Sequence, residues 1–171
     1  MSEIMNENQD NDMIQVHVAS GERVEFTKEM RKEYTILIPD MLPVHFKLLR
    51  NIFTLHGYRV GLLKNTGRKV VDTGLKYVHN DTCYPALLVI GQMISALQSG
   101  KYDVNKVALM ITQTGGGCRA SNYIHLLRKA LVKAGLGHIP VISLNLSGLE
   151  SNSGFHLTLE MLYQALIGLT Y

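Results

Sequence analysis

Short runs of β-branched and apolar residues alternate along this chain with longer segments in which apolar residues recur every three or four positions. The first kind of run is typical of a buried strand, and the second of a helix with one apolar face. We expect strands in residues 34–38, 58–63, 106–112 and 141–144. Strands separated by helices predict a layered α/β fold with a largely parallel sheet and right-handed crossovers.

The helical repeats fall between these runs and end at glycines. One apolar face precedes Gly57, a second precedes Gly100 and a third precedes Gly135. The basic, glycine-containing stretch that passes through Thr73 and Gly74 is interpreted as a connection. We therefore expect helices on both faces of the sheet, in a Rossmann-like or flavodoxin-like arrangement. The apolar positions of the three helices are Leu48, Ile52 and Leu55; Leu87, Ile90, Ile94 and Leu97; and Ile124, Leu127, Leu131 and Ala134.

The composition favours one domain with a short tail. Residues 1–20 are expected to form a disordered acidic tail, because residues 1–12 carry four acids, no basic residue and no apolar periodicity. With 46% hydrophobic residues, residues 21–171 are expected to form a single α/β domain. Residues 156–169 have the apolar density of a packed helix but no capping glycine or basic last turn. We therefore expect the domain to be a fragment of a larger protein.

Several classes of protein are disfavoured by the sequence. The start of the chain lacks the charged segment and apolar run of a signal peptide, and no apolar stretch approaches the ~20 residues that cross a bilayer. Two cysteines do not make a disulfide scaffold. The basic residues are scattered in pairs without an interleaved aromatic stripe, which disfavours nucleic-acid binding. We expect a cytoplasmic protein that binds neither a membrane nor a nucleic acid.

The two cysteines stand in two similar turns. Cys83 lies in residues 81–85 and Cys118 in residues 113–119, and each turn is expected between a strand and a helix. The positive end of a helix stabilises a thiolate, which suits such a cysteine to metal ligation. Loops that leave the carboxyl ends of parallel strands gather at one edge. We therefore expect both sulfurs in a common crevice, within about 6 to 7 Å of each other if they share one cluster.

Other interpretations of these turns remain open. The glycines 115–117 form either a tight turn or a phosphate cradle, but Cys118 and Arg119 follow where a phosphate loop carries lysine and a hydroxyl residue. The dinucleotide-binding spacing is not met either. His79 and His125 are alternative zinc ligands without a supporting spacing, a Cys–His nucleophilic site is another alternative, and each cysteine alone is compatible with simple packing.

Four blocks of residues carry a resemblance to a known family. They are KYVHNDTCYP at 76–85, SGKYD at 99–103, QTGGGCR at 113–119 with Asn122 and Tyr123, and PVISLN at 140–145 with residues 148–150. Over residues 26–171 the chain resembles the carboxyl-terminal, dehydratase-like region of the large 2-hydroxyacyl-CoA dehydratase activase proteins.

The resemblance implies iron–sulfur chemistry. Members of this superfamily bind a 4Fe-4S cubane or a double-cubane cluster through cysteines and work with low-potential electrons from an ATP-driven activator. By position, Cys83 and Cys118 correspond to cluster ligands. Backbone amides of Gly115, Gly116 and Gly117 would approach the cluster sulfurs. Arg119 would offset the cluster charge or meet a phosphate of a CoA thioester, and a capping role for it is equally open.

The chain also departs from the family pattern. The sugar-kinase-like ATPase domain is not found in it, and two cysteines leave the ligand set of a cluster incomplete. We therefore expect an activase ATPase, a dehydratase subunit or the remainder of a longer chain to complete the site, and we expect the isolated chain to be inactive. The alternative is a non-catalytic α/β interaction module that keeps the family fold without a cluster.

Overall fold

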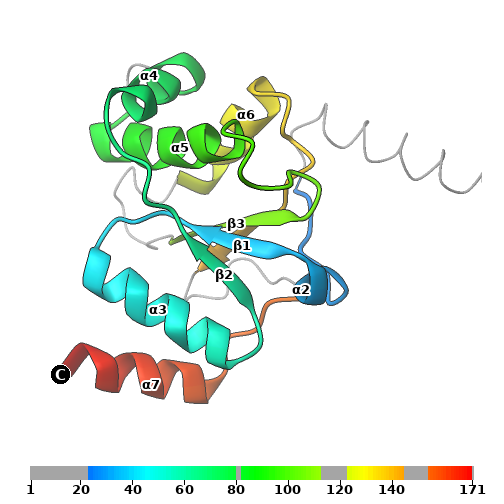
Figure 1. Ribbon diagram of the computed structural model, residues 1–171, viewed down its shortest axis with the longest axis vertical. Coiled ribbons are helices and arrows are strands. Elements are labelled where there is room, and N and C mark those ends of the chain that lie inside the picture. The colour runs from blue at the N-terminus through cyan, green and yellow to red at the C-terminus, as the bar shows by residue number, and fades with distance from the viewer. Residues whose placement is uncertain (1–22, 80–81, 113–122, 145–153, 171) are drawn as a thin grey trace, which may run out of the picture.

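Four parallel strands form one sheet in the computed structural model of the chain, which describes residues 23–79, 82–112, 123–144 and 154–170 (Figure 1). The strand order is β2-β1-β3-β4, and every pairing is parallel. The expected α/β fold with a parallel sheet is therefore confirmed. The acidic tail expected in residues 1–20 lies outside the described residues. The strands are β1 (Thr35–Ile38), β2 (Arg59–Leu62), β3 (Val107–Thr112) and β4 (Val141–Leu144).

Helices cover both faces of this sheet, as expected. In Figure 1, α4, α5 and α6 lie above the sheet, and α3 and α7 lie below it. None of the helices in the described ranges is long and apolar enough to cross a membrane. The more specific expectation of a Rossmann-like or flavodoxin-like arrangement stays a prediction. The helices are α2 (Met30–Glu33), α3 (Pro43–Leu55), α4 (Arg68–Tyr77), α5 (Tyr84–Leu97), α6 (Tyr123–Lys133) and α7 (Leu159–Thr170).

The two faces of the sheet hold separate apolar clusters. Leu37, Leu109 and Ile111 pack with α5 and α6 on one face. Ile36 and Met110 pack with α3 on the other. Because neighbouring residues of β1 and β3 point into opposite clusters and both clusters are buried, these strands appear in the sequence as continuous apolar runs without alternation.

The interpretation of the stretch through Thr73 and Gly74 as a connection is wrong, because residues 68–77 form the helix α4. Its buried positions are Val70, Thr73 and Gly74, and the remaining surface is largely basic and polar. Apolar and polar residues do separate onto opposite faces of α4, but the segment is on average polar and contains a glycine, features that are also typical of a connection. Glycine at position 74 lets α4 approach α5, since a Cβ there would lie 2.5 Å from the backbone oxygen of Leu87.

The burial of Tyr34 leads to a prediction about alkaline pH. Tyr34 joins α2 to β1, and its ring lies edge-on to Phe26 with centroids 6.4 Å apart. Burial, with added repulsion from Glu33 and Asp103, raises the pKa of Tyr34 above its usual value. The unfolded chain therefore releases this proton at a lower pH than the folded chain, and the free energy of unfolding falls as pH rises above about 10.

Urea unfolding at neutral pH and above about pH 10 measures this fall. The variant Tyr34→Phe is expected to lose part of the alkaline decline. Tyr163→Phe is the matched control, because Tyr163 is exposed on α7. If both variants decline as steeply as the parent chain, Tyr34 is not the residue responsible.

Candidate functional site

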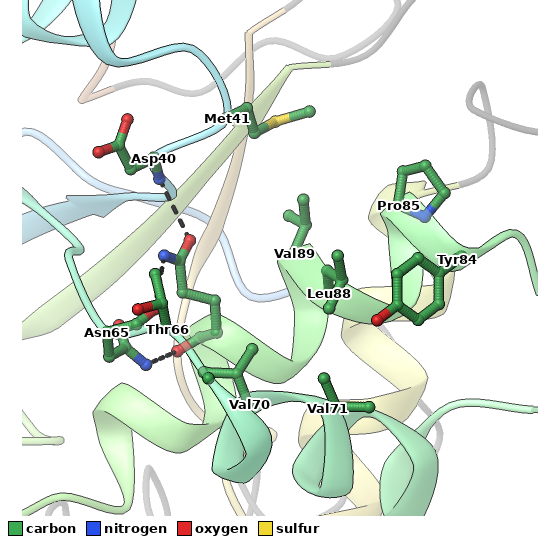
Figure 2. A pocket seen from close by; sticks show the side chains of 12 residues that line it. Asp40, Met41, Asn65, Thr66, Val70, Val71, Tyr84, Pro85, Leu88 and Val89 are labelled. Atoms are coloured by element: carbon green, nitrogen blue, oxygen red, sulfur yellow. Dashed lines mark hydrogen bonds between the residues drawn. The ribbon is translucent and has the colours of Figure 1, made fainter.

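A pocket of about 470 Å³ opens at the carboxyl edge of the sheet (Figure 2). The turn after β1, the loop after β2 and the first turns of α4 and α5 meet there. Its volume falls within the range of small-molecule sites. Most of the lining is apolar, supplied by Met41, Val70, Val71, Tyr84, Pro85, Leu88 and Val89.

Gln92 holds the polar end of this pocket together. Its side-chain oxygen accepts a hydrogen bond from the backbone N–H of Asp40 at 3.2 Å, and its side-chain nitrogen donates to the backbone oxygen of Asn65 at 2.9 Å. The side chain of Asn65 donates in turn to the backbone oxygen of Gln92, also at 2.9 Å (Figure 2). Gln92 is only 7% exposed. One buried side chain thus fixes the ends of two strands against α5.

Asp40 has a buried carboxylate oxygen without a hydrogen-bond partner among the described residues. A buried acceptor that has lost water and gained no donor costs free energy. Asp40 also lines the pocket. A water molecule or a donor group of a ligand would satisfy this oxygen.

Cys83 directly precedes Tyr84 and Pro85, two residues that line the pocket. It is the N-cap residue of α5 and a half-buried free cysteine. Its Sγ lies 3.1 Å from the hydroxyl of Tyr123, the first residue of α6. The starts of the two helices that follow the two cysteine turns in the sequence therefore meet at this point.

The surroundings of Cys83 correct one expectation. The residue does not follow a strand, because α4 precedes it and the turn joins two helices. It nevertheless lies at the carboxyl edge, since the next two residues line the same pocket as Asp40 and Asn65. The sequence prediction was wrong because helix α4 was not recognised. Cys83 lies at the carboxyl edge of the sheet because α5, which it precedes, begins at that edge.

The other predicted site residues are not brought together by the described part of the chain. Cys118, the glycines 115–117 and Arg119 lie outside the described residues, so the distance between the two sulfurs stays a prediction. His79 and His125 are both exposed. Within residues 23–79, 82–112, 123–144 and 154–170, no three histidine, cysteine or acidic side chains gather into a group that could hold a metal ion.

The pocket itself was missed by the sequence analysis. A weak signal was present, because Gln92 is a glutamine inside a strongly apolar helix, and Asp40 and Asn65 each follow closely after a strand. A polar residue at a core position generally has hydrogen-bond partners. The sequence contains no local indication that these three residues share one network, since they come from separate segments.

Comparison with protein-family models, with curated proteins and with solved structures returned no match. The resemblance to the activase proteins therefore stays a prediction that rests on the residues quoted for it.

Proposed function

We propose that this chain contributes thiolate ligands to an iron–sulfur cluster in a system of the 2-hydroxyacyl-CoA dehydratase activase type. The observation that carries the proposal is the 3.1 Å contact between Sγ of Cys83 and the hydroxyl of Tyr123. Tyr123 begins α6 shortly after Cys118 in the sequence. The contact therefore supports a shared site for the two cysteine turns.

The position of Cys83 fits a thiolate ligand. The residue caps the 14-residue helix α5, whose first backbone N–H groups and macrodipole favour negative charge. A ligating cysteine is deprotonated, so the Tyr123 hydroxyl would donate the hydrogen bond to Cys83. Such a donor raises the reduction potential of a cluster. The cluster, when bound, supplies low-potential electron transfer.

The remaining ligands are part of the proposal. Cys118 is the second ligand, with the backbone amides of glycines 115–117 near the cluster sulfurs and Arg119 offsetting its charge. Clusters are commonly held by four cysteines, whereas this chain has two cysteines. An activase ATPase, a dehydratase subunit or a further segment of a longer chain supplies the rest.

The exposed face of α7 favours a second candidate, an α/β interaction module without a cluster. Met161 is buried against the core, whereas Leu159 is 86% exposed, and Tyr163 and Leu166 are each 65% exposed. Leu162 and Ile167 extend this apolar face. Contiguous exposed apolar side chains of this kind commonly mark a protein contact.

Anaerobic reconstitution with ferrous iron and sulfide tests the first candidate. The isolated chain is expected to hold substoichiometric and labile iron, because two thiolates leave a cluster under-ligated. Co-expression with an activase or dehydratase subunit is expected to raise the iron content. Cys83→Ser and Cys118→Ser should each reduce it to near background, whereas Tyr123→Phe should retain iron and lower the reduction potential.

Two outcomes would contradict this proposal. A complete cluster that survives gel filtration of the lone chain and is untouched by Cys83→Ser would remove the ligand assignment. A stable complex with the partner that holds no iron in either the parent chain or Cys83→Ser would favour the interaction module. Circular dichroism of each variant separates loss of iron from loss of fold.

A further inference from the structure

A second hollow, of about 450 Å³, lies beside α5 and is lined by three lysines. Lys64 follows β2, Lys69 lies in the first turn of α4, and Lys101 follows α5. No aspartate or glutamate is found among the described residues that line it. Three separate segments of the chain thus bring like charges to one small volume.

None of these lysines forms an ion pair within the described ranges. The ion pairs there join Arg68 to Asp72 at 3.6 Å and Lys106 to Glu33 at 3.7 Å. The acid nearest to Lys101 in the sequence is Asp103, and its carboxylate accepts a hydrogen bond from the backbone N–H of Asn105. The side chains of Lys64, Lys69 and Lys101 are all exposed, and a bound anion would supply the opposite charge that they lack in the described part of the chain.

Hydroxyl groups complete the lining. Ser95 on α5 is 5% exposed and lies at this hollow, and Tyr102 lines it from the segment after α5. Ser99 also lines it, but its hydroxyl proton is donated to the backbone oxygen of Ala96. Lysine ammonium groups bind phosphate as point charges, and hydroxyls donate hydrogen bonds to its oxygens. A phosphate carries more charge and more acceptor oxygens than a carboxylate, so it matches three lysines better.

Two of the lysines are carried by segments that are already held in place. Asn65, next to Lys64, is tied to Gln92 by two hydrogen bonds of 2.9 Å. The backbone N–H of Lys101 donates to the hydroxyl of Ser99, which donates to the backbone oxygen of Ala96 at 2.6 Å. These hydrogen bonds fix the backbone from which the two lysines project, so the backbone loses little entropy when a ligand binds. We propose that this hollow binds the phosphate groups of a small phosphorylated ligand, independently of any cluster at Cys83.

Titration calorimetry with inorganic pyrophosphate at low ionic strength tests the proposal. Lys64→Gln, Lys69→Gln and Lys101→Gln are each expected to raise the Kd about fivefold, and the triple variant should lose measurable binding. Lys47→Gln is the matched control, because Lys47 is exposed on α3, on the opposite face of the sheet. Added salt should weaken binding to the parent chain.

Amide chemical shifts locate the bound pyrophosphate. Changes concentrated in residues 62–69 and 95–102 support the proposal, and thermal unfolding of each variant shows whether the fold is intact. Changes elsewhere, or a control variant that weakens binding as much as the three others, would overturn it. Tight binding of a single-stranded oligonucleotide without binding of pyrophosphate would also overturn it, since the site would then be a nucleic-acid surface.

Discussion

Replacing Gly91 with alanine is expected to lower the free energy of unfolding by about 3 kcal/mol, because α4 and α5 leave no room for a side chain between them. A Cβ at this position would clash with the backbone oxygen of Val70 and would lie 2.9 Å from the backbone nitrogen of Gly74. Both obstacles are main-chain atoms, which cannot rotate away as a side chain can. The two helices would have to separate along their contact.

Urea unfolding measures the loss, and the melting temperature should fall by about 10 °C for a chain of this length. Gly168→Ala on α7 is the matched control, since the three atoms nearest to the added Cβ would all belong to the side chain of Leu48, with Cδ2 at 2.6 Å. That side chain can move, and alanine favours the helix, so the control should change stability by less than about 1 kcal/mol. Equal effects of the two substitutions would show that the contact between α4 and α5 is not tight.

Replacing Gln92 with leucine is expected to cost about 2 kcal/mol and to loosen the polar end of the pocket. Leucine is apolar and similar in size, so the substitution leaves little empty space. It does remove the partners of the Asp40 backbone N–H and of the Asn65 backbone oxygen. Both groups are partly buried, and each would have to find water or remain without a partner.

Gln98→Leu provides the control for this prediction. Gln98 follows the last turn of the same helix and is exposed, and its side chain makes one hydrogen bond, to the hydroxyl of Tyr77 at 3.0 Å. Its loss should cost less than about 0.5 kcal/mol. Urea unfolding compares the two variants, and amide shifts of Asp40 and Asn65 report on the pocket. A small effect of Gln92→Leu together with unchanged shifts would mean that the network contributes little.

The strands could be predicted from sequence because their burial is a local property. Each strand of a parallel sheet covered on both faces needs an apolar side chain at almost every position, so β1 and β3 stand out as short continuous runs. The helix α4 could not be recognised in the same way. The segment is polar on average, and its buried residues are only Val70, Thr73 and Gly74. Their close contact with α5 depends on Gly91, which lies in that other helix.

The candidate site likewise has one part that the local sequence indicates and another part that depends on the folded structure. Cys83 was found because a cysteine before Tyr84 and Pro85 marks the start of a helix, which is local information. The pocket and its network join Asp40, Asn65 and Gln92, which are far apart in the chain and meet only after the sheet has formed. The residues around Cys118 lie outside the described part, so the sequence remains the basis for their proposed role.

Helices α5 and α7 differ in how much of the structure must unfold before each helix is exposed to solvent. Every residue of α5 from Ala86 to Leu97 except Leu88 is buried, between the sheet and its neighbouring helices, so its amides exchange with solvent only when much of the domain unfolds. In contrast, α7 packs on α3 and exposes its outer side. Its separation from α3 would leave the pairing of the four strands intact. A protein that bound the exposed side of α7 would therefore act on a unit that can open by itself, while α5 would keep Cys83 and the pocket in place.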